Sequence, residues 1–309
     1  MSRAVRFERY GGVEVLEVVE LDPPEPGDGQ LLVRVRAAGL NPFDSKLRNG
    51  TYDGQIPLSF PAAEGNDFSG IVEQVGPDTV GFEIGDRVYG TTPKRGSHAE
   101  LALAAPGKTI ARPPGLSWEI AGSLWTVATT AQAAVAAVAA GAGDVVVVAG
   151  ASGGVGALAS QLAVARGATV IGVTSEPSHD WLRSLGITPI AYGDGLAERL
   201  RQAAADAGGS LDALIDTVGR GYVALAVELG IAPERIDTIA DFQAASEYGV
   251  KTDGASAADS AEVVEEIARQ IVSGDIDFPI AATFPLDEVR EAYTLLESGH
   301  PPGKIVLIP

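Results

Sequence analysis

A glycine-rich turn between a buried strand and a helix constrains the fold more than any other feature of the sequence. Residues 145–148 are consecutive valines, and such a run is typical of a parallel strand buried on both faces. The chain continues as Ala149-Gly150-Ala151-Ser152-Gly153-Gly154-Val155-Gly156, and residues 155–166 are rich in alanine and leucine, which predicts a helix. A strand, a glycine-rich turn and a helix in this order are the phosphate-binding start of a dinucleotide-binding unit.

The glycines of this turn have separate expected roles. Gly153 and Gly154 would let the backbone turn tightly and approach a pyrophosphate, and Gly156 would let the helix pack close to the strand. The helix N-terminus would add N–H donors and a positive dipole end. The match to G-x-G-x-x-G is imperfect, because Ala151 stands at the first glycine, so a plain tight turn is the alternative. The predicted phosphate-binding residues are Ser152, Gly153, Gly154 and Val155.

The end of the next predicted strand, residues 169–173, indicates which dinucleotide is bound. Enzymes that use NAD usually carry an acidic residue there for the ribose 2′-hydroxyl. This chain has Thr174 and Ser175, which leave room for a 2′-phosphate and favour NADP(H). Against this, Glu176 follows directly and the first later cation is Arg183. The alternative is that the two hydroxyls only cap the next helix.

The surrounding pattern predicts an α/β chain with two domains. The first third reads as short strands between Gly and Pro turns, including a segment from Val13 to Val19 and the alternating residues 33–37. Residues 117–272 alternate β-rich and helical segments, as in a doubly wound parallel sheet. A helix is expected to start at Asp259, with Glu262 completing a capping box. The tail returns to the first domain through a helix over residues 287–298 and a strand over residues 304–308.

Composition excludes several classes of protein. The 309 residues contain no cysteine, which removes disulfides, thiolate metal sites and cysteine nucleophiles. The net charge of −19 makes nucleic acid and anionic membrane surfaces poor partners. The start of the chain carries no apolar signal segment, and the alanine-rich stretch at residues 131–148 is too interrupted to span a bilayer. We expect a cytoplasmic protein, and a homodimer.

Several motifs along the chain resemble those of the medium-chain dehydrogenase/reductase superfamily. They are Gly39-Leu40-Asn41-Pro42-Phe43-Asp44, Gly65-Asn66-Asp67-Phe68-Ser69-Gly70, Gly81-Phe82-Glu83-Ile84-Gly85-Asp86-Arg87-Val88, the turn at residues 151–156 and Gly303-Lys304-Ile305-Val306-Leu307. The resemblance implies a GroES-like β-domain formed by residues 1–122 and 279–309, and a Rossmann domain formed by residues 123–278.

Within that superfamily, the chain is similar to the zinc-independent quinone oxidoreductases, the ζ-crystallin-like branch. Zinc-dependent members carry Gly-His-Glu near position 65, where this chain has Gly65-Asn66-Asp67, and the cysteine-rich zinc lobe is absent. Because a metal needs converging ligands, we expect no metal site. The histidines are His98, His179 and His300, and we expect each to be a solvated surface residue.

The resemblance also implies roles for individual residues. Asn41 would orient cofactor or substrate, Lys46 would bond to the nicotinamide ribose or the developing oxyanion, and Tyr52 would donate to the acceptor oxygen. Surface residues of a mobile loop are the alternative for Lys46 and Tyr52. For Asp44 and Asp67 we expect structural bonds to nearby backbone. The further cofactor contacts implied by the resemblance are Thr130, Tyr192, Val218, Gly219 and Lys304.

The function expected from the sequence is zinc-independent reduction of a quinone or an α,β-unsaturated carbonyl by NADPH. Both acceptors place negative charge on an oxygen, so the protein needs to align the nicotinamide, donate hydrogen bonds and exclude water. Two alternatives stay open. One is an enoyl-thioester reductase of the same fold, and the other is a non-catalytic NADPH-binding protein.

Overall fold

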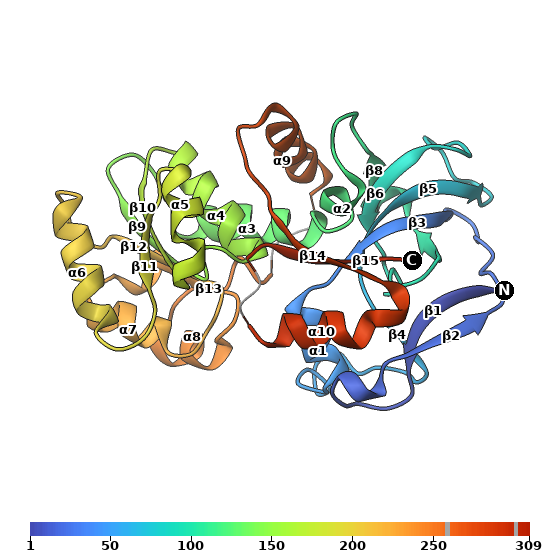
Figure 1. Cartoon of the computed structure of the whole chain (residues 1–309), viewed down its shortest axis with the longest axis horizontal. Coiled ribbons are helices and arrows are strands. Elements are labelled where there is room, and N and C mark those ends of the chain that lie inside the picture. The colour runs from blue at the N-terminus through green and yellow to red at the C-terminus, as the bar shows by residue number, and fades with distance from the viewer. Residues whose placement is uncertain (257–259, 300–301) are drawn as a thin grey trace. The chain divides into compact units, whose positions relative to one another are not determined.

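The computed structural model describes residues 1–256, 260–299 and 302–309, which form two compact units (Figure 1). Unit 1 comprises Met1–Thr126 and Ala261–Pro309, and unit 2 comprises Val127–Ser260. The sequence predicted the return to the first unit at residue 279. The structure has it at Ala261, because helix α9 (Ala261–Ser273) packs against strand β8 (Thr109–Ala111) of unit 1. Nothing local in the sequence shows which surface covers the apolar face of an amphipathic helix.

Unit 2 is built on a parallel five-stranded sheet in the order β11-β10-β9-β12-β13. This arrangement confirms the doubly wound fold class. Its strands are β9 (Val145–Ala149), β10 (Thr169–Thr174), β11 (Thr188–Ala191), β12 (Ala213–Asp216) and β13 (Ile236–Thr238). Its helices are α3 (Trp125–Ala137, which starts in unit 1), α4 (Gly154–Ala165), α5 (His179–Ser184), α6 (Leu196–Asp206), α7 (Tyr222–Glu228) and α8 (Phe242–Tyr248).

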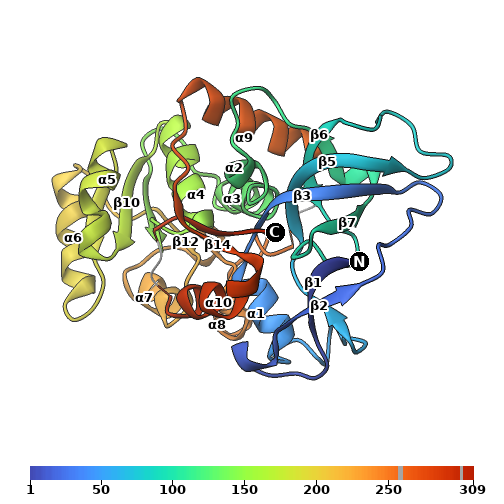
Figure 2. The ribbon, with the colours of Figure 1, turned by 45° about the vertical axis from the view of Figure 1, so that its right-hand side comes forward.

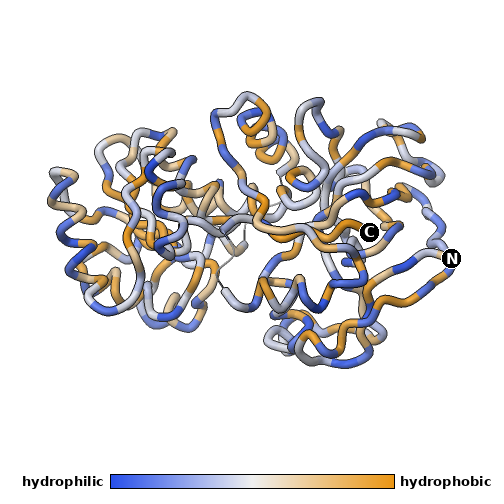
Figure 3. The backbone as a smooth tube through the Cα atoms, in the orientation of Figure 1, coloured by the Kyte–Doolittle hydropathy of each residue, from blue (hydrophilic) through white to orange (hydrophobic). Residues whose placement is uncertain are grey.

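The central strand β9 is buried on both faces, as its run of valines predicted. Val145 and Val147 pack in one cluster with Leu200 of α6 and Val223 of α7. Val146 is fully buried as well and points to the opposite face of the sheet. Helix α6 is amphipathic, and hydrophilic and hydrophobic residues alternate along it in Figure 3. The interior of unit 2 is therefore a sheet between apolar helix faces.

Unit 1 is mainly antiparallel and contains two sheets. A three-stranded sheet has the order β2-β1-β4, and a larger one has the order β14-β15-β3-β5-β6-β8, with β7 also paired to β3 (Figure 2). The strands are β1 (Ser2–Phe7), β2 (Glu17–Leu21), β3 (Leu31–Gly39), β4 (Ala62–Ala63), β5 (Asp67–Val75), β6 (Arg87–Thr91), β7 (Leu101–Ala104), β14 (Ile280–Pro285) and β15 (Lys304–Ile308). The helices are α1 (Pro42–Arg48), α2 (Trp118–Ala121), α9 and α10 (Val289–Glu297).

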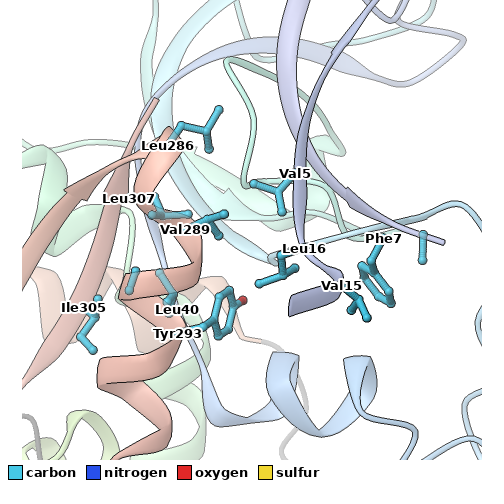
Figure 4. Close-up of a cluster of buried hydrophobic side chains, with 12 residues drawn as sticks. Val5, Phe7, Val15, Leu16, Leu40, Leu286, Val289, Tyr293, Ile305 and Leu307 are labelled. Carbon is cyan, nitrogen blue, oxygen red and sulfur yellow. The ribbon is translucent and has the colours of Figure 1, made fainter. Parts of the chain in front are cut away.

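The C-terminal segment completes the core of unit 1. Val289 and Tyr293 of α10 and Leu307 of β15 pack with Leu16 and Phe7 from the start of the chain (Figure 4). Strand β15 pairs antiparallel with β3, with Val306 opposite Gly39. These contacts bring Lys304, the first residue of β15, to the end of β3 at which the Asn41 motif begins.

One local prediction differs from the structure. The segment from Val13 to Val15 is a 3₁₀-helix and not a strand, and β2 begins only at Glu17. Alternation is weak evidence over so few residues, and Val15 is buried in the core beneath α10. The capping box predicted at Asp259 lies outside the described residues. None of the helices in the described part of the chain has the length and apolar character needed to cross a membrane.

Candidate functional site

The turn between β9 and α4 depends on two glycines. Gly150 has a φ of +77°, and a Cβ there would lie 2.5 Å from Thr217 Oγ1. A Cβ on Gly156 would lie 2.1 Å from the carbonyl oxygen of Gly150. Gly153 has a φ of −78°, which any residue adopts, so the tight bend that we expected at Gly153 is made at Gly150 instead. The close approach that we expected at Gly156 is confirmed, although its partner is the turn itself and not the strand.

This turn fits the pyrophosphate of a dinucleotide. Helix α4 begins at Gly154, and the N–H groups of a first helical turn point out of the helix toward the preceding loop. Together with the helix dipole they favour an anion. Strand β9 has β10 on one side and β12 on the other, so the turn lies at the carboxyl edge where the strand order reverses, the usual ligand position in such sheets.

The hydroxyl groups at the end of β10 meet the turn. Ser152 Oγ and Thr174 Oγ1 are 2.6 Å apart, and both residues are buried. Thr174 therefore ties the turn to the neighbouring strand, and Ser175 follows it as a half-buried residue. Tyr192 is 48% exposed in the turn after β11, where the guanidinium of Arg199 donates to the carbonyl oxygen of Ala191 at 2.8 Å. Cofactor contacts by Ser175 and Tyr192 stay predictions.

A buried carboxylate shapes the turn after β12. Asp216 Oδ1 accepts hydrogen bonds from the backbone N–H groups of Val218 and Gly219, at 2.9 and 2.8 Å. Its Oδ2 accepts from Thr238 Oγ1 at 2.8 Å, which links β12 to β13. Sequence reasoning singled out Val218 and Gly219 and missed Asp216 and Thr238, which hold that turn in place. Thr130, the other predicted cofactor contact of unit 2, is half-buried on α3.

In unit 1, Asn41 stands between β3 and α1. Its backbone N–H donates to Asp44 Oδ2 at 3.0 Å, which closes the first turn of α1. Asp44 Oδ1 accepts from Asn66 Nδ2 at 2.8 Å. The two sequence motifs that carry these residues therefore meet in space. The structural role expected for Asp44 is confirmed, and its contacts extend to the second motif as well as to local backbone.

The side-chain amide of Asn41 is held from two sides. Lys304 Nζ donates to Asn41 Oδ1 at 2.7 Å and to the carbonyl oxygen of Leu40 at 2.6 Å. Asn41 Nδ2 donates to Asp67 Oδ2 at 3.2 Å, and Asp67 Oδ1 accepts from Thr126 Oγ1 at 2.7 Å. We expected Lys304 to face the cofactor and Asp67 to bond local backbone. Lys304 is buried, and its ammonium is hydrogen-bonded to Asn41. The partners of Asp67 are Asn41 and Thr126, which are distant from it in sequence.

Burial shifts the titration of both charged groups in this network. Burial raises the pKa of the Asp67 carboxyl to about 6, although Lys304 and the hydroxyl of Thr126 oppose the shift. Burial lowers the pKa of Lys304 to about 8, against the attraction of Asp67 and Asp44. At neutral pH a buried ammonium therefore faces a buried carboxylate across the Asn41 amide.

Lys46 and Tyr52 lie on and just after α1. Both residues are half-buried, and the ring of Tyr52 packs 5.7 Å from the ring of the exposed Phe43. Burial raises the pKa of the Tyr52 phenol. A phenol with a raised pKa keeps its proton at neutral pH and is suited to donate a hydrogen bond. The structure leaves the substrate and cofactor contacts of both residues as predictions.

A second buried cluster of charges in unit 1 is centred on Glu64. Glu64 Oε2 is 2.9 Å from Arg95 Nη2, its Oε1 is 3.6 Å from Arg48 Nη1, and the Arg48 guanidinium lies 4.5 Å from the ring centre of Tyr293. Burial raises the pKa of Glu64 to about 7. His98, which we expected at the surface, is fully buried, with Nδ1 3.4 Å from the Tyr293 hydroxyl. That expectation was wrong, because burial follows from contacts with residues distant in sequence.

The other two histidines of the chain are His179 and His300. His179 is half-buried at the start of α5, and His300 lies outside the described residues. Within residues 1–256, 260–299 and 302–309, no three His, Asp or Glu side chains converge as a metal site. Glu64 and Arg48 were missed by sequence reasoning, since charged residues in loops and short helices are normally exposed.

Comparisons with known proteins identify the class to which this fold and these motifs belong. The model of the alcohol dehydrogenase GroES-like domain matches residues 27–140, and the model described as zinc-binding dehydrogenase matches residues 185–307. A quinone oxidoreductase of Pseudomonas aeruginosa is 29% identical over the full length of both chains. The human quinone oxidoreductase is 38% identical over 174 residues, which cover 56% of this chain and 52% of that relative.

Solved structures agree in fold. The quinone oxidoreductase of Coxiella burnetii has a TM-score of 0.85 and 29% identity, covering 100% of this chain and 99% of that one. A mycobacterial protein determined in complex with NADPH has a TM-score of 0.85 and 25% identity, covering 100% of both chains. The chain belongs to the medium-chain dehydrogenase/reductase superfamily and is an oxidoreductase. Within the superfamily it is similar to the quinone oxidoreductases.

Proposed function

We propose that this oxidoreductase binds NADPH and reduces a quinone or an α,β-unsaturated carbonyl without a bound metal. The observation that carries the proposal is the turn at Gly150, which precedes the N-terminus of α4 and is tied through Ser152 to Thr174. Thr174 and Ser175 offer hydroxyls where a carboxylate would repel a 2′-phosphate. The NADPH complex of the mycobacterial relative supports the same cofactor.

In this proposal the residues of unit 2 hold the cofactor. The first turn of α4 and the backbone from Ser152 to Val155 bind the pyrophosphate, and Ser175 and Tyr192 contact the adenosine side. When bound, NADPH supplies a hydride. Thr130 and the turn at Val218 and Gly219 orient the nicotinamide side, and Asp216 keeps that turn fixed through its two backbone hydrogen bonds.

In the same proposal, residues of unit 1 contact the acceptor and the reactive part of the cofactor. Tyr52 donates a hydrogen bond to the acceptor oxygen, where charge develops as the acceptor is reduced. Lys46 binds the nicotinamide ribose or the same oxygen. Asn41 orients cofactor or substrate through its amide. None of these roles needs a side chain to change its charge before the reaction.

The chemistry of the donor set supports independence from zinc. Zinc-dependent relatives place a Cys or Asp soon after the Gly39–Leu40 turn, where this chain has Asn41, and a histidine where it has Asn66. Carboxamides are weaker zinc ligands than thiolate or imidazole. The Lys304 ammonium already binds Asn41 Oδ1 at 2.7 Å and would repel a second cation at that oxygen.

Titration of the purified protein with NADPH and NADH, followed by an NADPH oxidation screen, tests the proposal. The screen covers quinones, enals, enones and enoyl thioesters, with and without prior chelation. We expect tighter binding of NADPH, turnover of quinones or enones, and no loss of activity after chelation. A preference for enoyl thioesters would support the thioester reductase instead. Tight NADPH binding without turnover of any acceptor would support a non-catalytic binding protein. Zinc that is lost together with activity would refute metal independence.

A further inference from the structure

The ends of three neighbouring strands meet at Asn41. Strand β15 begins at Lys304, β3 ends at Gly39 just before Asn41, and β5 begins at Asp67, and these strands are adjacent in the order β15-β3-β5. Since both pairings, β15 with β3 and β3 with β5, are part of one sheet, backbone hydrogen bonds bring the three residues to the same edge. The contact from Lys304 to Asn41 spans 263 residues of sequence.

The chemistry of the two partners determines how the Asn41 amide is oriented. A lysine ammonium has only donors, so the group 2.7 Å from Lys304 Nζ must be the amide oxygen. A carboxylate has only acceptors, so the group 3.2 Å from Asp67 Oδ2 must be the amide nitrogen. The reverse orientation would place the amide nitrogen against the Lys304 ammonium and the amide oxygen against the Asp67 carboxylate. Burial makes both mismatches costly.

We infer that Lys304 and Asp67 are positioning residues, which fix the Asn41 amide so that its second N–H is presented to an acceptor oxygen of the bound substrate or cofactor. An amide nitrogen carries two N–H donors, and Asp67 takes one of them. The oxygen of the same amide is engaged by Lys304. This inference rests on the proposed function, and it specifies that Asn41 acts as a hydrogen-bond donor.

Asp67 is itself fixed by a third residue. Its Oδ1 accepts from Thr126 Oγ1 at 2.7 Å, and its Oδ2 also lies 3.3 Å from the Thr126 backbone N–H. Thr126 is in the first turn of α3, so the carboxylate is anchored to a helix terminus while it receives the Asn41 amide. Asp67, Asn41 and Lys304 are all at most 4% exposed, so solvent does not compete for these bonds.

The asparagines of the chain make the orientation directly measurable. Asn41, Asn49 and Asn66 are the only asparagines in the sequence, so labelling with [¹⁵N]asparagine produces three side-chain amide pairs in an NMR spectrum. Single Asn41→Ala and Asn49→Ala variants assign them. We expect slow hydrogen exchange for the Asn41 pair. In Lys304→Met the chemical shifts of the Asn41 pair should change, and its hydrogen exchange should be at least tenfold faster. The shifts and exchange rate of the Asn49 pair should not change, because Asn49 accepts from the exposed Thr51. An unaltered Asn41 pair in Lys304→Met would overturn the inference.

A double-mutant cycle separates positioning from general support of the fold. Lys304→Met should lower kcat about tenfold, which corresponds to about 1.4 kcal/mol, and should leave the dissociation constant of NADPH within threefold. Lys304→Gln retains an N–H donor and should recover most of the loss. In the Asn41→Ala background, Lys304→Met should change kcat less than twofold. An equal loss in both backgrounds would mean that Lys304 acts independently of Asn41.

A further variant covers the case in which Lys304→Met does not fold. Asn41→Asp keeps an oxygen for Lys304 but removes both N–H donors, so a donor role predicts a loss of kcat as large as in Asn41→Ala. Retained activity in Asn41→Asp would show that Asn41 acts as an acceptor and would overturn the inference. If the wild-type protein reduces no acceptor, the proposed function fails, while the NMR measurement still decides whether Lys304 orients Asn41.

Discussion

The α-carbon of Gly156 approaches the carbonyl oxygen of Gly150 so closely that a Cβ on Gly156 would stand 2.1 Å from that oxygen. Since the obstacle is backbone, it does not move aside as a side chain would. We expect Gly156→Ala to lower the free energy of unfolding by about 1–3 kcal/mol, the usual range for overpacking, and to weaken NADPH binding because the turn shifts. Thermal and urea unfolding, together with NADPH titration, measure both effects.

Gly153→Ala is the matched control for this prediction. A Cβ on Gly153 would lie 3.4 Å from the same Gly150 oxygen, an ordinary contact, and its φ of −78° suits alanine. We expect a change in stability within about 0.5 kcal/mol, as for ordinary substitutions. Equal effects of the two substitutions would show that the close approach of Gly156 does not shape the turn.

The parts of this fold that could be predicted from sequence have local signals. The valines of β9, the turn and α4 lie within about two dozen consecutive residues, and each carries its own pattern. The alternation of Val33, Arg34 and Val35 likewise predicts one buried and one exposed face, and the structure confirms it. The placement of the turn that we propose to bind the pyrophosphate follows from the same signals, because strand order in βα units obeys general rules.

The residues that sequence reasoning misplaced depend on distant partners. His98 is buried because Tyr293, which lies 195 positions later, packs beside it. Glu64 is buried because it pairs with two arginines from other segments. The contact between Lys304 and Asn41 likewise joins two residues that are distant in sequence. A single sequence predicts that charged side chains are exposed, and only the three-dimensional pairing shows which ones are exceptions.

Ser175 is predicted to contribute to the choice between NADPH and NADH. Ser175→Asp places a carboxylate beside the expected 2′-phosphate site, so NADPH affinity should fall about tenfold or more through charge repulsion. NADH affinity should stay the same or improve, since an acid at this position accepts from ribose hydroxyls. Fluorescence titration with both nucleotides measures the ratio of NADPH affinity to NADH affinity. Ser184→Asp, which adds the same charge at an exposed position of α5, should leave it unchanged. A loss of NADPH affinity in both variants would indicate a general charge effect.

Lys46 is predicted to bind the cofactor. If its ammonium binds the nicotinamide ribose, Lys46→Ala should raise the NADPH Michaelis constant and lower turnover, and should leave the acceptor Michaelis constant nearly unchanged. Lys46→Arg should retain part of the affinity because it keeps a donor and the charge. Steady-state kinetics that vary NADPH and acceptor separately test this. A change confined to the acceptor Michaelis constant would instead indicate that Lys46 binds the acceptor oxygen on which negative charge develops.

Tyr52 is predicted to act only where charge develops on the acceptor oxygen. Removal of such a donor from a dry, preorganised site costs about 2.7–4 kcal/mol. Tyr52 is only half-buried and quinones accept electrons readily, so we expect Tyr52→Phe to lower kcat by about tenfold, or about 1.4 kcal/mol. The ring contact with Phe43 is retained in the variant, so stability should not change. Wild-type kinetics in both Tyr52→Phe and Lys46→Ala would show that this segment is not the reaction centre.

The last prediction concerns the pH dependence of stability in unit 1. Burial lowers the pKa of His98 to about 4, with Asp44 opposing the shift and Arg95 and Lys304 adding to it. An unfolded histidine titrates near pH 6.5. Between these values the unfolded chain binds a proton that the folded protein does not bind. The contribution of His98 to stability is therefore present above about pH 6.5 and is lost as the pH falls toward 4.

Two carboxyl groups act in the opposite direction. Burial raises the pKa of Asp67 to about 6 and that of Glu64 to about 7, so their contributions are present at low pH and are lost as the pH rises through those values. The pH profile of the wild-type protein is the sum of these opposing effects. Only the difference between the wild type and a single variant isolates one group.

We expect the stability difference between wild type and His98→Gln to decrease by about 3 kcal/mol between pH 7 and pH 4. The corresponding difference for Asp67→Asn should change in the opposite sense over the same range. Trp118 and Trp125 lie in unit 1 and Trp181 lies in unit 2, so urea unfolding followed by fluorescence in a Trp181→Phe background reports on unit 1. Parallel profiles for wild type and His98→Gln would mean that His98 takes up a proton in the folded state as readily as in the unfolded chain. Burial would then not hold the imidazole neutral.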